Sequence, residues 1–295
     1  RYLAWPHLLR PLAGGLRDVT SVYGYAGPLL CGCEPGDSFL ERAAARIFEL
    51  WRSQDVVTVF TRFHPILENH LGLSAEDVVA GGQTVAIDLA FAEEAQWSDY
   101  QGGLRNHINR GRRLGLRTEA DSAWDRLPDF ARFYRAAMER NRAERRYYFP
   151  IEYFEDLRRS LGPHVVLMVT RLGEEVAAAG IFTEYGGIVQ NHFSMNNPAL
   201  LDLAPTKVLL DDVRRWAAGR GNRVFHLGGG RGSSGDSLFA FKAAFSRWRL
   251  AFYTGRWITK PAAYERLSGG LAAAEGSFFP AYRATLERPE VALDP

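Results

Sequence analysis

The second half of the chain shows hydrophobic patterns that switch between helical and strand spacing. Three apolar stretches in its middle are joined by the short connections GEE and YGG, which predict an antiparallel meander. Taken in order, the pattern predicts one strand, two helices, three strands, a helix, a strand, a helix and a final strand. The expected elements are 114–120, 124–141, 151–160, 164–172, 175–185, 187–195, 205–219, 223–227, 236–248 and 249–258.

The first half has fewer clear patterns. Residues 37–53 have helical spacing, with Asp37 or Ser38 as the capping residue. Residues 55–63 and 83–91 have the β-branched composition of strands, and residues 97–114 are expected to be helical. Helices and strands that alternate along the whole chain predict an α/β protein.

Composition adds little chemistry of its own. Hydrophobic residues make up 46% of the chain and charged residues 24%, as in an ordinary soluble globular protein. We find neither a secretory signal nor an apolar run approaching the ~18 residues of a spanning helix. The chain begins with Arg1 rather than methionine, so we expect residues upstream of it.

Two cysteines, Cys31 and Cys33, are separated by one residue. This spacing suits neither a relaxed disulfide nor a four-ligand zinc site, so we expect a reducing cytoplasm and no metal. The net charge is only +2, and only three of the 36 basic residues are lysines. An argument from positive charge must therefore depend on where the arginines gather.

The stretch HLGGGRGSSGDSLFAFKAAF, residues 226–245, joins a strand to a helix through glycines. Such a loop can present backbone amides to an anion, or it can be a flexible connection to a helix capped by Asp236 or Ser234. It fits neither the dinucleotide motif nor the P-loop. In the helix, Lys242 lies about 100° from Phe241 and borders the expected buried stripe, which is formed by Leu238, Phe241, Phe245 and Trp248.

The order of elements in the second half resembles the GNAT acyltransferase topology, and the first half resembles the later part of a second copy. Two such domains in tandem resemble the Fem-type aminoacyltransferases, which move an amino acid from aminoacyl-tRNA onto an amine of a peptide or peptidoglycan precursor. The stretches that carry the resemblance are YGYAGPLL (23–30), FTRFHP (60–65), LRNHINRGRRLGL (104–116), NHFSMNNP (191–198), APTKVLLDDVRRWA (204–217) and LGGG…DSLFAFKAAF (227–245).

The resemblance implies mixed central sheets flanked by helices in two domains. We expect an N-terminal GNAT-like domain over 1–113, incomplete at its start, and a C-terminal one over 114–295 whose last helix packs back on the first. It implies no metal and no organic cofactor. The chain is shorter than typical Fem-type proteins and has no inserted coiled-coil arm.

The resemblance places Phe241 and Lys242 at the acyl-transfer centre. An amine that attacks an ester builds negative charge on the carbonyl oxygen, and a fixed cation stabilises that charge. Gly229, Gly230 and Arg231 of the preceding loop are expected to contact substrate. The alternative for Lys242 is an ordinary surface lysine.

The loop before the helix at 205–219 bears on the donor. CoA-dependent GNAT enzymes carry an R/Q-x-x-G-x-G/A run here, whose amides hold the pyrophosphate. This chain has NNPALLDLAPTK, without a glycine, so a CoA donor bound in the usual way is not expected. Aminoacyl-tRNA is the donor that the resemblance leaves.

A tRNA donor requires phosphate contacts. Residues 104–117 contain five arginines and no acidic residue, and residues 140–149 interleave arginine with aromatic residues. The alternative for both segments is a solvated helix face. The arginines that we expect to bind tRNA are Arg110, Arg112, Arg113, Arg145 and Arg146.

Acceptor-binding groups are expected where strands end. The resemblance gives this role to the first-domain segments that contain Tyr23, Tyr25, Arg62, His64 and Asn69. In the second domain, Asn191 and His192 occupy adjacent strand positions, so that only one of them can face a cleft. His192 is either a base for the attacking amine or a core histidine, and the Asp211–Asp212 pair is expected to be solvated.

These expectations describe a cytoplasmic aminoacyltransferase that forms an amide bond by using aminoacyl-tRNA and an amine-bearing acceptor. The acceptor is a peptide, a peptidoglycan precursor or a peptide natural product. One alternative is an N-acyltransferase of the GNAT superfamily that uses acyl-CoA. Another is a binding protein with the GNAT fold and no activity, for which Lys242 would serve no purpose.

Overall fold

The computed structural model describes residues 1–32, 38–230, 236–269 and 278–286. Contacts divide the chain into unit 1, which is Arg1–Gln83 with Leu250–Pro295, and unit 2, which is Thr84–Arg249. The expected boundary between two copies of the fold, after residue 113, differs from this division. That boundary stays a prediction, because compactness does not show where a repeated fold begins.

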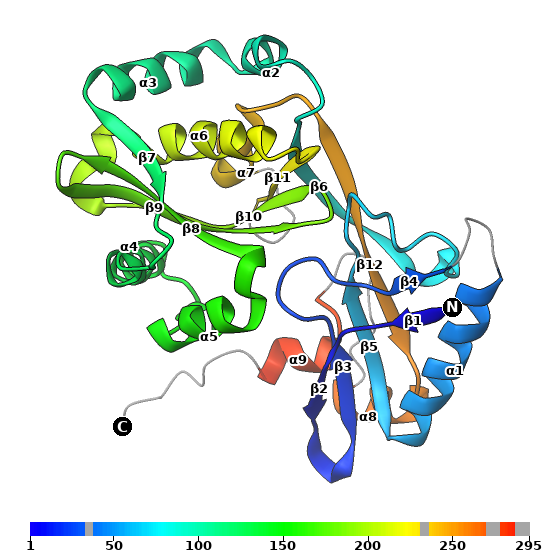
Figure 1. The fold of residues 1–295 in the computed structure, drawn as a ribbon. Helices are drawn as coiled ribbons and strands as arrows, with labels where there is room; N and C mark the ends of the chain where they lie inside the picture. Colours follow the sequence, from blue (N-terminus) through cyan, green and yellow to red (C-terminus); the bar gives the residue numbers. More distant parts are fainter. Residues whose placement is uncertain (33–37, 231–235, 270–277, 287–295) are drawn as a thin grey trace, which may run out of the picture. The chain divides into compact units, whose positions relative to one another are not determined.

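Unit 1 has a sheet with helices on both faces (Figure 1). β2 pairs antiparallel with β3, β3 parallel with β5, and β5 antiparallel with β12, while β1 and β4 form a separate antiparallel pair. The elements are β1 (Tyr2–Ala4), β2 (Leu8–Pro11), β3 (Arg17–Thr20), β4 (Leu29–Cys31), α1 (Phe39–Ser53), β5 (Val56–Arg62), the first part of β6 (Val78–Asp88), β12 (Arg249–Ile258), α8 (Pro261–Ser268) and α9 (Ala281–Leu286).

The core of unit 1 lies on both faces of β5, because consecutive strand residues point to opposite sides. Val56 packs in an aromatic cluster with Trp51 of α1, and Val57 packs with Tyr282 of α9. The Tyr282 hydroxyl donates to Oδ2 of the buried Asp18 at 3.2 Å. Segments from both ends of the sequence therefore build one core.

Unit 2 has a sheet in the order β6-β11-β10-β9-β8-β7. β10 and β11 are parallel, and the other neighbours are antiparallel. The elements are β6, α2 (Glu93–Asp99), α3 (Gly102–Arg113), β7 (Leu116–Ala120), α4 (Leu127–Arg140), α5 (Ile151–Leu161), β8 (Val165–Leu172), β9 (Glu175–Tyr185), β10 (Ile188–Asn196), α6 (Pro205–Gly219), β11 (Val224–Gly229) and α7 (Ser237–Ala243).

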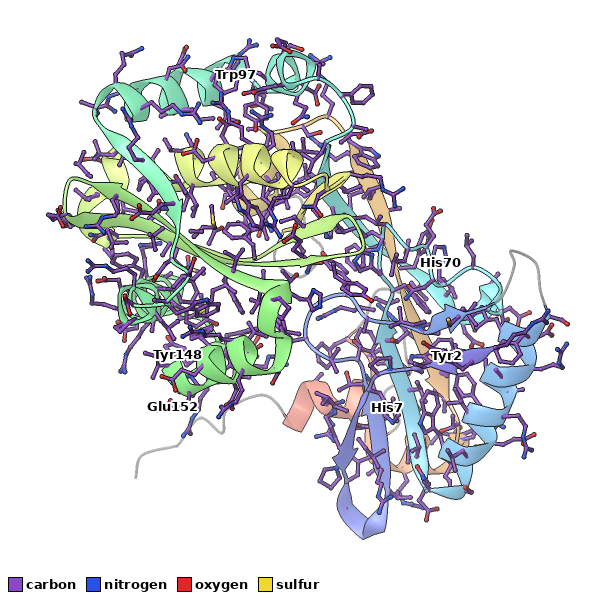
Figure 2. The ribbon with its side chains drawn as sticks, viewed as in Figure 1. Tyr2, His7, His70, Trp97, Tyr148 and Glu152 are labelled. Atoms are coloured by element: carbon purple, nitrogen blue, oxygen red, sulfur yellow. The ribbon has the colours of Figure 1, made fainter. Side chains whose placement is uncertain are left out.

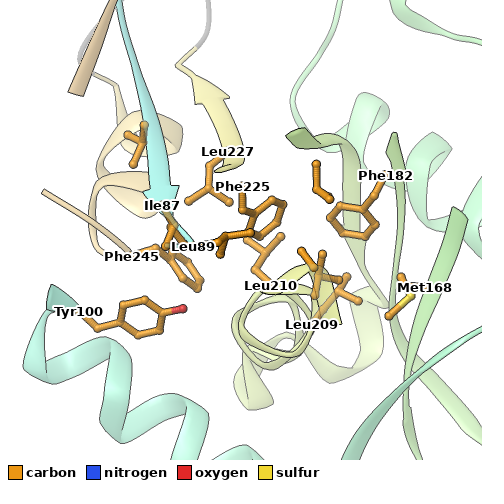
Figure 3. Close-up of a cluster of buried hydrophobic side chains, with 14 of the residues drawn as sticks. Ile87, Leu89, Tyr100, Met168, Phe182, Leu209, Leu210, Phe225, Leu227 and Phe245 are labelled. Atoms are coloured by element: carbon orange, nitrogen blue, oxygen red, sulfur yellow. The ribbon is translucent and has the colours of Figure 1, made fainter. Parts of the chain in front are cut away.

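Two cores lie on opposite faces of the sheet of unit 2. On one face α3, α6 and α7 cover a cluster that includes Leu209 and Phe225 (Figure 3). On the other face α4 and α5 cover a cluster that includes Phe130 and Phe193. The expected α/β fold, with mixed sheets flanked by helices, is confirmed, as are the order of elements in the second half and its antiparallel meander.

Three details of the expected elements were wrong. The single helix over 97–114 is two helices, α2 and α3, because Tyr100 and Gln101 have extended backbones. Four short strands within the first 31 residues were not expected. The helix over 236–248 ends at Ala243, for a reason given below.

Candidate functional site

The glycine-rich loop and Lys242, singled out from sequence, come together in unit 2. β11 ends at Gly229, and α7 begins after Asp236, whose side chain caps it by accepting a hydrogen bond from the Phe239 amide at 2.9 Å. One turn later, Lys242 Nζ donates to the Gly229 carbonyl at 2.8 Å. The helix thus holds its ammonium group against the last residue of the strand. Arg231 lies outside the described residues.

The surroundings of Lys242 change its acidity. Burial lowers the pKa of its ammonium group to about 8, and the nearby Asp236 carboxylate opposes this shift. Gly228 is shaped to this neighbour, because its φ is +83° and a Cβ on it would lie 3.2 Å from Lys242 Nζ. The group is therefore a desolvated cation near neutral pH, which an ordinary surface lysine is not.

Phe241 anchors α7 to the core. Its ring lies 5.6 Å from that of the fully buried Phe245, in an edge-on arrangement. The expected buried stripe is correct for these two residues, but Trp248 is 37% exposed. α7 stops at Ala243, where Arg249 closes the helix by donating to the carbonyls of Ala243 at 3.3 Å and Ser246 at 2.6 Å.

A β-bulge in β10 changes the expected choice between Asn191 and His192. The register moves from Asn191 opposite Phe182 to Phe193 opposite Ile181, so His192 is the extra residue. Strict alternation, on which the choice depended, does not hold here. The parallel pairing of β10 with β11 ends just before the bulge, where Gln190 lies opposite His226.

The two bulge side chains differ in chemistry. Asn191 Nδ2 donates to Ser194 Oγ at 3.3 Å, while its buried Oδ1 accepts no hydrogen bond from the described residues. The His192 ring packs 4.3 Å from Phe193, and burial lowers its pKa to about 4. His192 is therefore neutral at pH 7, and its pKa is low for a base that takes a proton from an ammonium ion.

In the loop before α6, asparagine side chains occupy two of the backbone amides. Asn196 Oδ1 accepts from the Thr206 amide, and Asn197 Oδ1 accepts from the Ala199 amide, each at 3.0 Å. Pro205 has no amide hydrogen to offer. The position at which CoA-dependent GNAT enzymes hold a pyrophosphate thus has two of its amides occupied by asparagine side chains.

In unit 1, two of the residues expected to bind the acceptor, Asn69 and His64, form hydrogen bonds with the backbone. Asn69 Nδ2 donates to the carbonyls of Ala26 at 2.7 Å and Pro28 at 3.0 Å, and its Oδ1 accepts from the His64 amide at 2.8 Å. A Cβ on Gly27 would lie only 2.6 Å from Asn69 Nδ2. Asn69 therefore clips two loops together.

His64 belongs to the same turn. Its Nδ1 accepts from the amides of Ile66 at 3.2 Å and Leu67 at 3.3 Å, and burial lowers its pKa to about 4. Tyr25 packs edge-on against His64, with ring centroids 6.3 Å apart. The alternative to acceptor binding is that His64 belongs to a structural His-Pro turn, and these contacts favour that alternative. Of this group, Arg62 and Tyr23 have exposed side chains.

The arginines expected to bind tRNA fall into two kinds. Arg112 donates from Nη2 to Asp211 Oδ2 at 2.6 Å and also binds Asp212. Arg110, Arg113 and Arg145 are exposed, and Arg146 is exposed but pairs with Glu144 at 3.0 Å. Figure 2 shows Tyr148, two residues beyond Arg146, beside α5. Because Arg112 is held by two aspartates, it has a structural role that the sequence pattern did not reveal.

The expectation that Asp211 and Asp212 are solvated was wrong for Asp211, which is fully buried. Asp211 Oδ1 accepts from the Tyr100 hydroxyl at 2.9 Å and from Arg214 Nε at 3.0 Å. Arg214 is 1% exposed. Both aspartates lie between Leu210 and Val213, two residues that face the core, so the sequence does not distinguish the buried aspartate from the partly exposed one.

Within the described residues, no helix could span a membrane, and no group of at least three acidic, histidine or cysteine side chains could hold a metal ion. Two surface hollows lie elsewhere in unit 2. One of about 700 Å³ lies between α4 and α5, and one of about 400 Å³ lies beside α3.

Comparisons with known proteins identify the fold. Residues 98–243 match a family model described as an acetyltransferase (GNAT) domain. A crystal structure of FemX is similar, with a TM-score of 0.67 and 11% identity over 88% of this chain and 85% of that one. A search of the curated proteins found no match.

Two further structures share the fold. The C-terminal domain (DUF2156) of a putative lysylphosphatidylglycerol synthetase from Agrobacterium fabrum gives a TM-score of 0.59, at 15% identity over 89% of this chain and 84% of that one. The L-PGS structure from Bacillus licheniformis gives 0.56, at 13% identity over 87% and 82%. The fold is that of GNAT-type acyltransferases. The chain thus has a Fem-like tandem GNAT fold.

Proposed function

We propose that the protein is an aminoacyltransferase, which moves an amino acid from aminoacyl-tRNA to the amine of a peptide, a peptidoglycan precursor or a peptide natural product. The observation that carries the proposal is the desolvated Lys242 ammonium group at the end of β11. The filled loop before α6 supports a donor other than CoA. The GNAT-type fold supports acyl transfer.

The chemistry follows from the charge that forms. The acceptor nitrogen attacks the ester carbon, a C–N bond forms, and the carbonyl oxygen becomes an oxyanion. Lys242 stabilises this oxyanion, a contact that is often worth ~3–4 kcal/mol. The C–O bond to the ribose then breaks, the ribose hydroxyl leaves with a proton, and the nitrogen gives up its extra proton to solvent or a nearby base.

The direct test is a transfer assay with charged total tRNA and a panel of acceptors. The panel contains peptides and cell-wall precursors, which offer amines, and phosphatidylglycerol, which offers only hydroxyls, since one similar structure is named as a putative lysylphosphatidylglycerol synthetase. A labelled ester on phosphatidylglycerol in place of an amide would contradict the proposed amide formation. We expect a labelled amide product that disappears when ribonuclease is added before the protein. A product that survives ribonuclease, or one formed only with acetyl-CoA, would contradict the proposal.

A second prediction concerns the donor alone. Calorimetric titration with acetyl-CoA is expected to show no binding at the ~1 μM–1 mM concentrations at which enzymes usually work, because α6 offers no free glycine loop for the pyrophosphate. Saturable binding accompanied by acetyl transfer would favour the acyl-CoA-dependent alternative. A CoA-dependent GNAT enzyme titrated in the same buffer is the positive control.

A further inference from the structure

Four arginines of α3 and β7 carry charge that no carboxylate offsets. Arg105 and Arg113 contact no acidic side chain in the described part of the chain, Arg110 donates to the Asp202 carbonyl at 3.2 Å, and Arg117 donates to the carbonyls of Arg112 and Leu116. We call Arg105, Arg110, Arg113 and Arg117 the α3 arginine surface. It includes two of the arginines singled out from sequence.

On the helices that cover the opposite face of unit 2, several arginines are paired with carboxylates. On α4, Arg132 pairs with Asp129 at 2.7 Å and Arg135 pairs with Glu139 at 3.0 Å. On α5, Arg159 pairs with Asp156. Abundance of arginine alone therefore does not produce an unpaired cluster, and the absence of acidic residues from 104–117 does.

A hollow of about 400 Å³ borders the α3 arginine surface. It is lined by Arg112, Leu116, Arg117, Thr118, Asp212 and Arg215. Arg112 is held by Asp211 and Asp212, which fixes this wall of the hollow. Arg117 belongs to both the hollow and the surface, so the two are continuous at β7. The other arginines of the hollow, Arg112 and Arg215, are paired with carboxylates and add no unpaired charge.

The apolar residues of α3 argue against a lipid partner. Leu104 and Ile108 are buried in the core, and Arg105 is half-buried. The exposed positions of α3 include Asn106, His107, Asn109, Arg110 and Arg113. A helix that lies on a membrane needs an apolar face directed outward. The only large apolar side chain exposed along the described segment is Leu114, at its end.

We propose that the α3 arginine surface binds the phosphate backbone of RNA, and that it holds the tRNA arm of the donor during transfer. Guanidinium groups pair with phosphate through two hydrogen bonds and stay charged at every working pH. No Phe, Tyr or Trp lies in α3 or β7 to stack on a base, so we expect contacts that do not depend on base sequence. This inference rests on the proposed function for the identity of the RNA.

The test measures binding of deacylated total tRNA by fluorescence anisotropy at several salt concentrations. The variant is Arg110→Gln with Arg113→Gln, two exposed side chains whose removal leaves the buried pairs intact. The logarithm of the binding constant falls as the logarithm of the salt concentration rises, and each lost phosphate contact should make this negative slope shallower by about 1. We therefore expect the slope of the variant to be shallower by about 2. The matched control is Arg132→Gln with Arg135→Gln on α4, which should keep the wild-type slope.

The outcomes separate this surface from the proposed function. An unchanged slope in the α3 variant would show that the α3 arginine surface does not bind RNA, even if charged tRNA serves as donor. A shallower slope supports RNA binding by this surface, even if no amino acid is transferred and the proposed function fails. If the variant keeps its tRNA affinity but no longer sediments with phosphatidylglycerol vesicles, the surface binds lipid and the inference is wrong.

Discussion

The Lys242→Met variant is expected to lose about 10²–10³ in kcat for aminoacyl transfer while the fold stays intact. Methionine keeps most of the apolar stem and favours a helix, so α7 should persist. The variant lacks the ammonium group that lies against Gly229. Because this cation acts on charge formed in the transition state, KM for both substrates should change little.

Two controls make this expectation sharp. Circular dichroism should show a folded Lys242→Met protein. Lys260→Met, which removes a partly exposed lysine of unit 1 paired with Asp55, should transfer at the wild-type rate. Transfer by Lys242→Met at close to the wild-type rate would exclude Lys242 from the reaction centre.

The pH dependence tests the same group independently. Burial lowers the pKa of Lys242 from its ordinary value to about 8, so the charged form is lost as the pH rises through about 8. Lys242→Arg should be only partly active at pH 7, because a planar guanidinium places its charge differently, but it stays charged above pH 8. The wild-type rate divided by the Lys242→Arg rate should therefore fall above pH 8. A constant ratio between pH 7 and 10 would contradict a catalytic cation at this position.

The second large effect is expected in stability. Asp211→Ala should lower the free energy of unfolding by about 3–5 kcal/mol, because it leaves the buried Arg214 without its closest carboxylate. It also removes the acceptors of the Tyr100 hydroxyl and of Arg112. Urea denaturation followed by tryptophan fluorescence measures the change.

Asp212→Ala is the matched control for this prediction. Asp212 neighbours Asp211 on α6 and also binds Arg112, but it is partly exposed. Its removal should cost no more than about 1 kcal/mol, as for other exposed pairs. Equal losses in the two variants would show that burial of Asp211 does not govern stability here.

The sequence predicted the fold of unit 2 well, because its signals are local. Short connections and alternating apolar residues over 164–195 allow one arrangement of three strands. The first 31 residues have strands of three or four residues, too short for periodicity to show.

The candidate site was predicted in part, and its misses have physical causes. Lys242 and Gly229 are only 13 residues apart and belong to one strand, loop and helix, so a local sequence pattern was enough to connect them. The bulge at His192 and the burial of Asp211 depend on neighbouring strands and helices, which a single sequence does not display. The end of α7 depends on Arg249, six residues beyond its last residue.

The discontinuity of unit 1 has a consequence for synthesis. Residues 84–249 leave the ribosome between the two segments of unit 1, so unit 2 can form while unit 1 still lacks β12, α8 and α9. The buried Asp18 carboxylate accepts hydrogen bonds from Tyr282, 264 residues later in the chain, and from Arg283 Nε at 2.9 Å. It therefore lacks these two donors until the end of the chain has been made. While β12 is still missing, the sheet of unit 1 has an unpaired edge on β5, which β12 covers later, and an unpaired strand edge can pair with a wrong strand.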